Sequence, residues 1–178
     1  MNRFAIRMVV LWGISLRFLT AAPPGGCEAM DLDQGWTREQ SEEFWFTSQG
    51  SRLMPYSWFL ALEVADAAAQ TLFRERSNID RYGYIWAPSS PRNPDGLPLG
   101  FAKDVADSGD EREHLGLTCA ACHTGSLRIG GKLVIVEGGP GMADFWAFLT
   151  DVVGALEAAA TAPAKFDRFS KTVLRSQN

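Results

Sequence analysis

Three residues that could do chemistry stand together in the second half of the chain. Cys119 and Cys122 are separated by two alanines, and His123 follows at once. Two cysteines one helical turn apart present both sulfurs on one side of a short helix. This C-x-x-C-H pattern is the attachment signature of c-type haem, in which each sulfur bonds to one vinyl group and the imidazole is the proximal ligand of the iron. The spacing therefore predicts one covalent haem c held by Cys119, Cys122 and His123.

Two other chemistries use a cysteine pair. A thioredoxin-like dithiol would be expected beside a βαβ pattern, which the sequence lacks. A structural zinc site needs four ligands, and His114 could complete a set with Cys119, Cys122 and His123, although the spacing of the two histidines is unfamiliar. A zinc or dithiol module is therefore the third hypothesis after two kinds of haem protein.

The second axial position of the iron separates those two kinds of haem protein. Met142, Met54 or His114 could close it, and a methionine there would make a higher-potential electron carrier. An open or water-bound position would instead permit chemistry on O2 or peroxide. The sequence leaves all four possibilities open, and it identifies no catalytic residue.

The helices before the motif are predicted from local signals. Thr37 and Gln40 have the capping-box form, which predicts a helix that continues to about Ser48 and stops at Gly50, with Phe44 and Trp45 on its buried side. Pro55 suits the first turn of a second helix, and apolar residues at helical spacing extend it to Leu72. Ser77 could cap a further short turn that ends near Gly83.

The segments around and after the motif are predicted in the same way. Residues 87–100 are rich in proline and glycine and form a loop that could wrap a haem edge, and residues 104–113 are acidic and solvated. Thr118 caps the short helix that carries the motif. Gly130-Gly131 joins the two strands of a hairpin within 127–136, a long helix covers 142–160 and Pro163 starts a last helix. This pattern predicts a mainly α fold with a small β-hairpin after the motif.

The N-terminus has the form of an export signal. Arg3 and Arg7 precede a short apolar run, and small residues follow at 20–22, where a signal peptidase could cut. We therefore expect a signal peptide at 1–22, a linker at 23–36, a haem domain at 37–178, and a periplasmic or otherwise extracytoplasmic location. Cys27 could carry a lipid, and a membrane is expected as a partner only in that case. The net charge of -4 argues against binding to nucleic acid.

Four segments together resemble one protein family. They are Tyr82–Tyr84, Asn93–Phe101, Gly116–Gly125 and Gly138–Phe145. The chain is similar to the di-haem cytochrome c peroxidase-like proteins, and in particular to the branch that includes the bacterial haem rubber oxygenases. The resemblance implies a cytochrome c-like fold and an oxidoreductase that acts on peroxide or O2. It carries over Cys119, Cys122 and His123 as the thioether and proximal ligands.

The chain departs from that family in the number of its haem motifs. Family members carry two haem groups in two domains, whereas this sequence holds one C-x-x-C-H and ends soon after the first haem domain. We expect a second haem domain or a redox partner protein to complete the enzyme, with a small oxidant as substrate. The alternative is a non-enzymatic mono-haem electron-transfer cytochrome c.

Overall fold

The computed structural model describes residues 29–67, 70–105 and 113–175. Within them the helices are α1 (Arg38–Phe46), α2 (Tyr56–Ala61), α3 (Arg76–Ile79), α4 (Phe145–Thr161) and α5 (Pro163–Arg175), with 3-10 turns η1 (Asp80–Tyr82) and η2 (Cys119–Ala121). The strands are β1 (Ala29–Asp31), β2 (Met54–Pro55), β3 (Phe101–Val105), β4 (Glu113–Leu117), β5 (Thr124–Ile129) and β6 (Lys132–Glu137). The predicted signal peptide at 1–22 and Cys27 lie outside the described residues.

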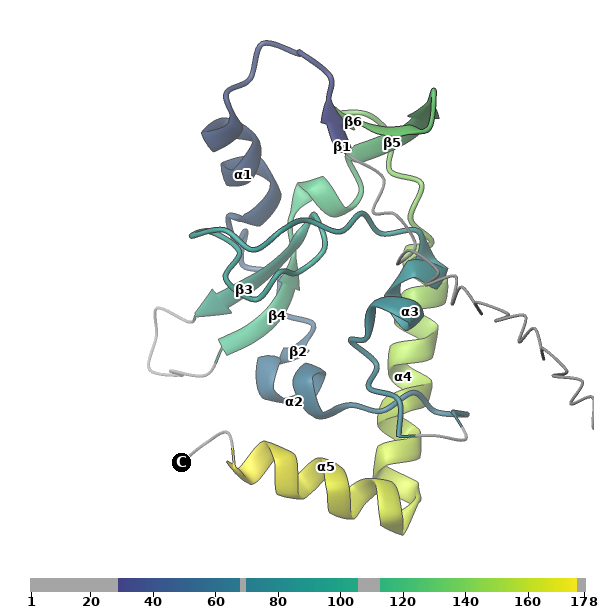
Figure 1. Cartoon of the computed structure of the whole chain (residues 1–178). Helices are drawn as coiled ribbons and strands as arrows, with labels where there is room; N and C mark the ends of the chain where they lie inside the picture. The colour runs from purple at the N-terminus through teal and green to yellow at the C-terminus, as the bar shows by residue number, and fades with distance from the viewer. Residues whose placement is uncertain (1–28, 68–69, 106–112, 176–178) are drawn as a thin grey trace, which may run out of the picture.

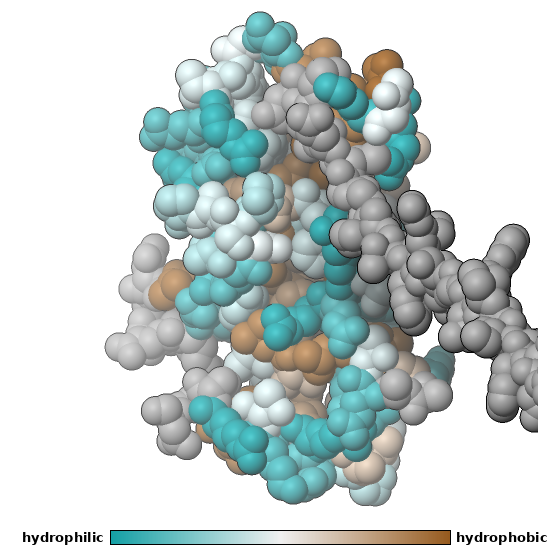
Figure 2. Space-filling view, in the orientation of Figure 1, coloured by the Kyte–Doolittle hydropathy of each residue, from teal (hydrophilic) through white to brown (hydrophobic). Residues whose placement is uncertain are grey.

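The strands form two three-stranded sheets, which makes the fold mixed α/β. The order β2-β4-β3 is antiparallel throughout, whereas in β1-β6-β5 the outer strand β1 runs parallel to β6. In Figure 1, α1 lies beside the β3–β4 sheet, the other sheet lies at the top, and α4 runs down from that end to α5. Hydrophobic residues reach the surface at the top right of Figure 2, and Leu127 and Ile129 of β5 are exposed.

The predicted mainly α, cytochrome c-like fold is therefore wrong. The error arose because β3 and β4 flank an acidic run that we expected to be solvated. Phe101 of β3 and Leu115 of β4 are fully buried, and Asp104 is buried as well, where its carboxylate accepts a hydrogen bond from Ser48 at 2.7 Å and pairs with Arg52. The pairing of backbones along two short strands makes this sheet, and neither strand has a strong local signal of its own.

An aromatic cluster occupies the main core. The ring of Phe148 in α4 packs edge to face against Phe73, Tyr82, Tyr84 and Phe101, with ring centroids 5.5 to 5.9 Å apart. Edge-to-face pairs at this spacing place the positive rim of one ring on the negative face of the next. The cluster thus joins α4 to the segment before β3 and to β3 itself.

Several local predictions are confirmed. Thr37 and Gln40 form both bonds of the capping box at the start of α1. β5 and β6 form the predicted hairpin around Gly130-Gly131. α4 and α5 begin close to the predicted positions, and residues 87–100 contain no helix or regular strand. β1, however, falls inside the segment 23–36 that was predicted as a linker.

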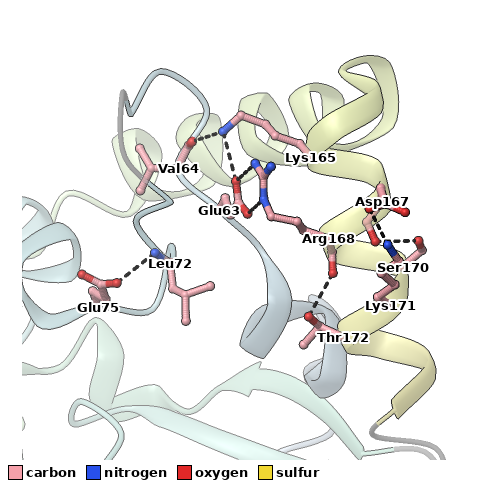
Figure 3. Close-up of polar contacts among 10 residues, drawn as sticks. All are labelled: Glu63, Val64, Leu72, Glu75, Lys165, Asp167, Arg168, Ser170, Lys171 and Thr172. Carbon is pink, nitrogen blue, oxygen red and sulfur yellow. Dashed lines mark hydrogen bonds and ion pairs between the residues drawn. The ribbon is translucent and has the colours of Figure 1, made fainter.

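The helix predicted from Pro55 to Leu72 is wrong after its first turns. α2 ends at Ala61, and the chain then folds back so that Phe73 donates its backbone N–H to the carbonyl of Leu62 at 2.7 Å. The segment after α2 contacts α5, where Arg168 makes two hydrogen bonds of 2.6 and 2.7 Å to the buried carboxylate of Glu63 (Figure 3). Lys165 donates to the carbonyl of Val64 at 2.7 Å, so this segment is held in an extended form.

The described residues contain no single helix with the length and hydropathy of a membrane-spanning segment. α4 and α5 meet the test only as a pair, and they are bent by 101° where they join.

Candidate functional site

The motif lies on a 3-10 turn whose two faces differ. Ala120 and Ala121 are 1% and 6% exposed and face the core, whereas Cys119, Cys122 and His123 are all exposed. Two alanines allow the turn to pack tightly because they bring no side chain beyond Cβ. The structure therefore leaves the side chains of the three predicted haem-binding residues accessible to solvent.

The start of the turn is fixed by Thr118, as predicted. The Thr118 hydroxyl accepts the backbone N–H of Ala120 at 3.2 Å and donates to the carbonyl of Trp45 at 3.1 Å. The Thr118 N–H donates to the carbonyl of Gly100 at 2.8 Å, and the Gly100 N–H donates to Trp45 as well. Gly100 has a φ of +84° and no room for a side chain, since a Cβ there would lie 2.1 Å from the nitrogen of Ala121. The sequence analysis missed this role of Gly100.

The end of the motif is bound to the loop after β6. Gly138 donates its N–H to the carbonyl of His123 at 2.8 Å, and Gly141 donates to the carbonyl of Cys122 at 2.7 Å. A Cβ at Gly141 would lie 2.9 Å from the Cys122 oxygen. The backbone of the motif is therefore held at both ends while its reactive side chains stay accessible.

The donor set fits a covalent haem. Both thiols are free and exposed, which thioether formation requires, and Cys119 Sγ donates to Oε1 of Gln49 at 2.9 Å. Within 29–67, 70–105 and 113–175, no three His, Cys, Asp or Glu side chains are arranged to hold a metal ion. The two sulfurs of a haem c bond to separate vinyl groups, so they need not converge on one metal ion.

The three candidates for the second axial position lie in different places. Met54 is 5% exposed inside the main core, and His114 lies near the far end of β4, roughly 15 Å along the strand from the motif. Met142 is 78% exposed and directly follows Gly141, which bonds to the backbone of Cys122. The tertiary structure thus brings only Met142 of the three beside the motif.

An open groove runs along α1 next to the motif. Its volume is about 620 Å³, and it is lined by Gly35, Trp36, Gln40, Glu43, Phe44, Thr47 and Gln49. Trp36 and Phe44 meet edge to face with centroids 5.3 Å apart, and Trp36 is 46% exposed. The sequence placed Trp36 just before the capping box but did not connect it to the motif.

Four buried polar atoms near the motif have no hydrogen-bond partner in the described parts of the chain. They are the hydroxyls of Tyr84 and Thr124, one carboxylate oxygen of Glu137 and Nε1 of Trp45. Tyr84 and Thr124 both line a cavity of about 10 Å³ behind the motif alanines, which is the size of one water molecule. Burial, together with the nearby Cys122 and Asp144, raises the pKa of the Tyr84 phenol well above its usual value, so the phenol stays protonated.

Comparison with known proteins finds a longer relative. The chain is 37% identical over 163 residues to the uncharacterized protein y4iJ of Sinorhizobium fredii (strain NBRC 101917 / NGR234), an alignment that covers 82% of this chain. It covers only 26% of the relative, so the chain spans about a quarter of that protein's length. No family model matches the chain, and no solved structure matches it.

Proposed function

We propose that this chain binds one haem c covalently and works as an extracytoplasmic oxidoreductase domain of the di-haem peroxidase or oxygenase type. The observation that supports the proposal is the exposure of Cys119, Cys122 and His123 in a segment whose backbone is held at both ends by hydrogen bonds. A bound haem would supply redox chemistry at its iron. The chain's own task is to hold that group and to orient its proximal ligand.

Attachment needs only the two free thiols. Each thiol adds across one vinyl C=C bond of the porphyrin, so that a C–S bond forms and the thiol hydrogen ends on the neighbouring vinyl carbon. The addition is redox-neutral and requires no oxidant, but it does require that Cys119 and Cys122 are not joined in a disulfide. The Gln49 amide then loses the S–H donor that it contacts now.

The peroxidase or oxygenase reading rests on the family resemblance of the segments around the motif. In that reading the chain acts with a second haem domain or a redox partner protein, and peroxide or O2 is the oxidant. A mono-haem electron-transfer cytochrome is the second candidate. It is favoured by one observation, the exposed thioether of Met142 beside the motif.

The test is expression with periplasmic haem-c maturation, followed by a pyridine haemochrome spectrum and acid–acetone extraction. We expect a c-type spectrum, one haem per chain, and colour that stays with the protein. The double substitution Cys119→Ala and Cys122→Ala should abolish covalent attachment, whereas His114→Ala should leave it unchanged. A colourless wild-type protein from cells that mature other c-type cytochromes would overturn the proposal.

Spin state separates the two candidates. A high-spin ferric spectrum that changes rapidly with peroxide would support the oxidoreductase. A low-spin spectrum with methionine character that Met142→Ala converts to high spin would support the electron carrier instead.

A further inference from the structure

We propose that the groove along α1 is the wall against which one face of the haem lies, with Trp36 and Phe44 as its apolar contacts. This inference rests on the proposed function, because it assigns a place to the group that Cys119 and Cys122 would hold. The groove's volume of about 620 Å³ is within the range of sites that bind large cofactors.

One end of the groove is in contact with the first cysteine of the motif. Gln49 lines the groove, and its Oε1 accepts the thiol of Cys119 at 2.9 Å. Two further hydrogen bonds hold α1 next to the motif: the Gly100 N–H and the Thr118 hydroxyl both donate to the carbonyl of Trp45 in α1. A group bonded to Cys119 therefore begins at the edge of the groove.

The segment just before Trp36 is linked to the backbone at the end of the motif. The side chain of Gln34 donates to the carbonyl of Glu137 at 2.9 Å and accepts its N–H at 2.8 Å. The next residue, Gly138, donates its N–H to the carbonyl of His123 at 2.8 Å. The chain that leads into the groove is therefore held near the motif by hydrogen bonds to the 137–138 segment.

The aromatic lining has the chemistry of a porphyrin contact. Trp36 is 46% exposed although it packs against Phe44, and both residues line the groove. An apolar ring bound there would cover part of this exposed surface, and stacked or edge-to-face contacts between aromatic rings are favourable. α1, which carries Phe44, is anchored by Trp45, which is 1% exposed.

A second exposed tryptophan provides a matched control. Trp146 in the first turn of α4 is 75% exposed and follows the motif in the sequence, whereas Trp36 precedes it. If the haem lay on that side instead, Trp146 would be its contact and Trp36 would not.

The experiment compares Trp36→Ala, Trp36→Phe and Trp146→Ala in the haem-loaded protein. Haem per chain is measured by pyridine haemochrome, and the contact with aromatic rings is measured by circular dichroism in the Soret band. We expect all three variants to keep covalent haem, and we expect Trp36→Ala to reduce the Soret signal because the ring in contact with the porphyrin is removed. Trp36→Phe should retain most of the signal, and Trp146→Ala should leave it unchanged.

The possible results distinguish a failure of the groove assignment from a failure of the proposed haem attachment. Covalent haem with a Soret signal that Trp36→Ala leaves unchanged, or that only Trp146→Ala alters, would overturn the groove assignment and keep the proposed function. A wild-type chain that carries no covalent haem would overturn both. A Trp36→Ala protein that fails to fold would show in the far-ultraviolet spectrum. Trp36→Leu, which keeps an apolar side chain but has no ring, then decides: a reduced Soret signal supports the assignment, and an unchanged signal refutes it.

Discussion

Gly100 should be the glycine whose replacement harms the motif most. A Cβ at this position would lie 2.1 Å from the nitrogen and 2.3 Å from the Cα of Ala121, whereas ordinary contacts are 3.4 to 4 Å. Gly100→Ala therefore forces the η2 turn and the chain before β3 to separate by more than an ångström. The separation also stretches the hydrogen bond from the Thr118 N–H to the Gly100 carbonyl.

The magnitude follows from two contributions. The positive φ of +84° costs an alanine about 1 to 2 kcal/mol. Overpacking against the backbone adds about 1 to 3 kcal/mol. Gly50 provides the control, because its φ of +79° is similar but nothing lies within 4 Å of its Cβ position. Gly50→Ala should thus cost only the first contribution.

The assay is urea unfolding of both variants and the wild type, with haem content measured after periplasmic maturation. We expect Gly100→Ala to lose about 1 to 3 kcal/mol more than Gly50→Ala. It should also carry less haem per chain, because the turn that presents the two thiols is displaced. Equal losses of stability in the two variants would refute the close approach of Gly100 to the motif.

Three further predictions concern polar groups. Glu63→Gln should lower the free energy of unfolding by about 2 kcal/mol at neutral pH, because hydrogen bonds to charged groups are strong, and the hydrogen bonds from Arg168 hold the pKa of Glu63 below its usual value. The ionised Glu63 carboxylate stabilises the fold fully above the ordinary glutamate pKa, and this stabilisation is lost as the pH falls through the pKa of Glu63 in the folded state. The difference in stability between Glu63→Gln and the wild type should therefore shrink in acid. A difference that does not change with pH in urea titrations would contradict this. Thr118→Val should cost about 1 to 2 kcal/mol in thermal unfolding, because the cap on Ala120 is lost, and an unchanged midpoint would argue against the cap. Tyr84→Phe should raise the free energy of unfolding in urea by about 1 kcal/mol, because the buried phenol has no hydrogen-bond partner among the described residues, and a loss of stability would contradict this.

Features that depend on neighbouring residues could be predicted from the sequence. The C-x-x-C-H pattern, the capping box at Thr37, the Thr118 cap and the hairpin at Gly130-Gly131 each lie within a few positions. Their physical causes are local hydrogen bonds and φ preferences, which act the same way in any surroundings.

Other features depend on contacts between segments that are far apart in the sequence. α2 ends at Ala61, and Glu63 in the extended segment that follows is bound by Arg168, 105 positions away. The β2-β4-β3 sheet depends on pairing of short strands that have little preference by themselves.

The position of the groove beside the motif also depends on contacts between residues that are far apart in the sequence. Gln34 reaches Glu137 across 103 positions, and Gln49 reaches Cys119 across 70. The amino-acid sequence alone indicates which residues would attach a haem. Only the folded chain shows which surface lies beside them, because contacts between residues far apart have no periodic signature in the sequence.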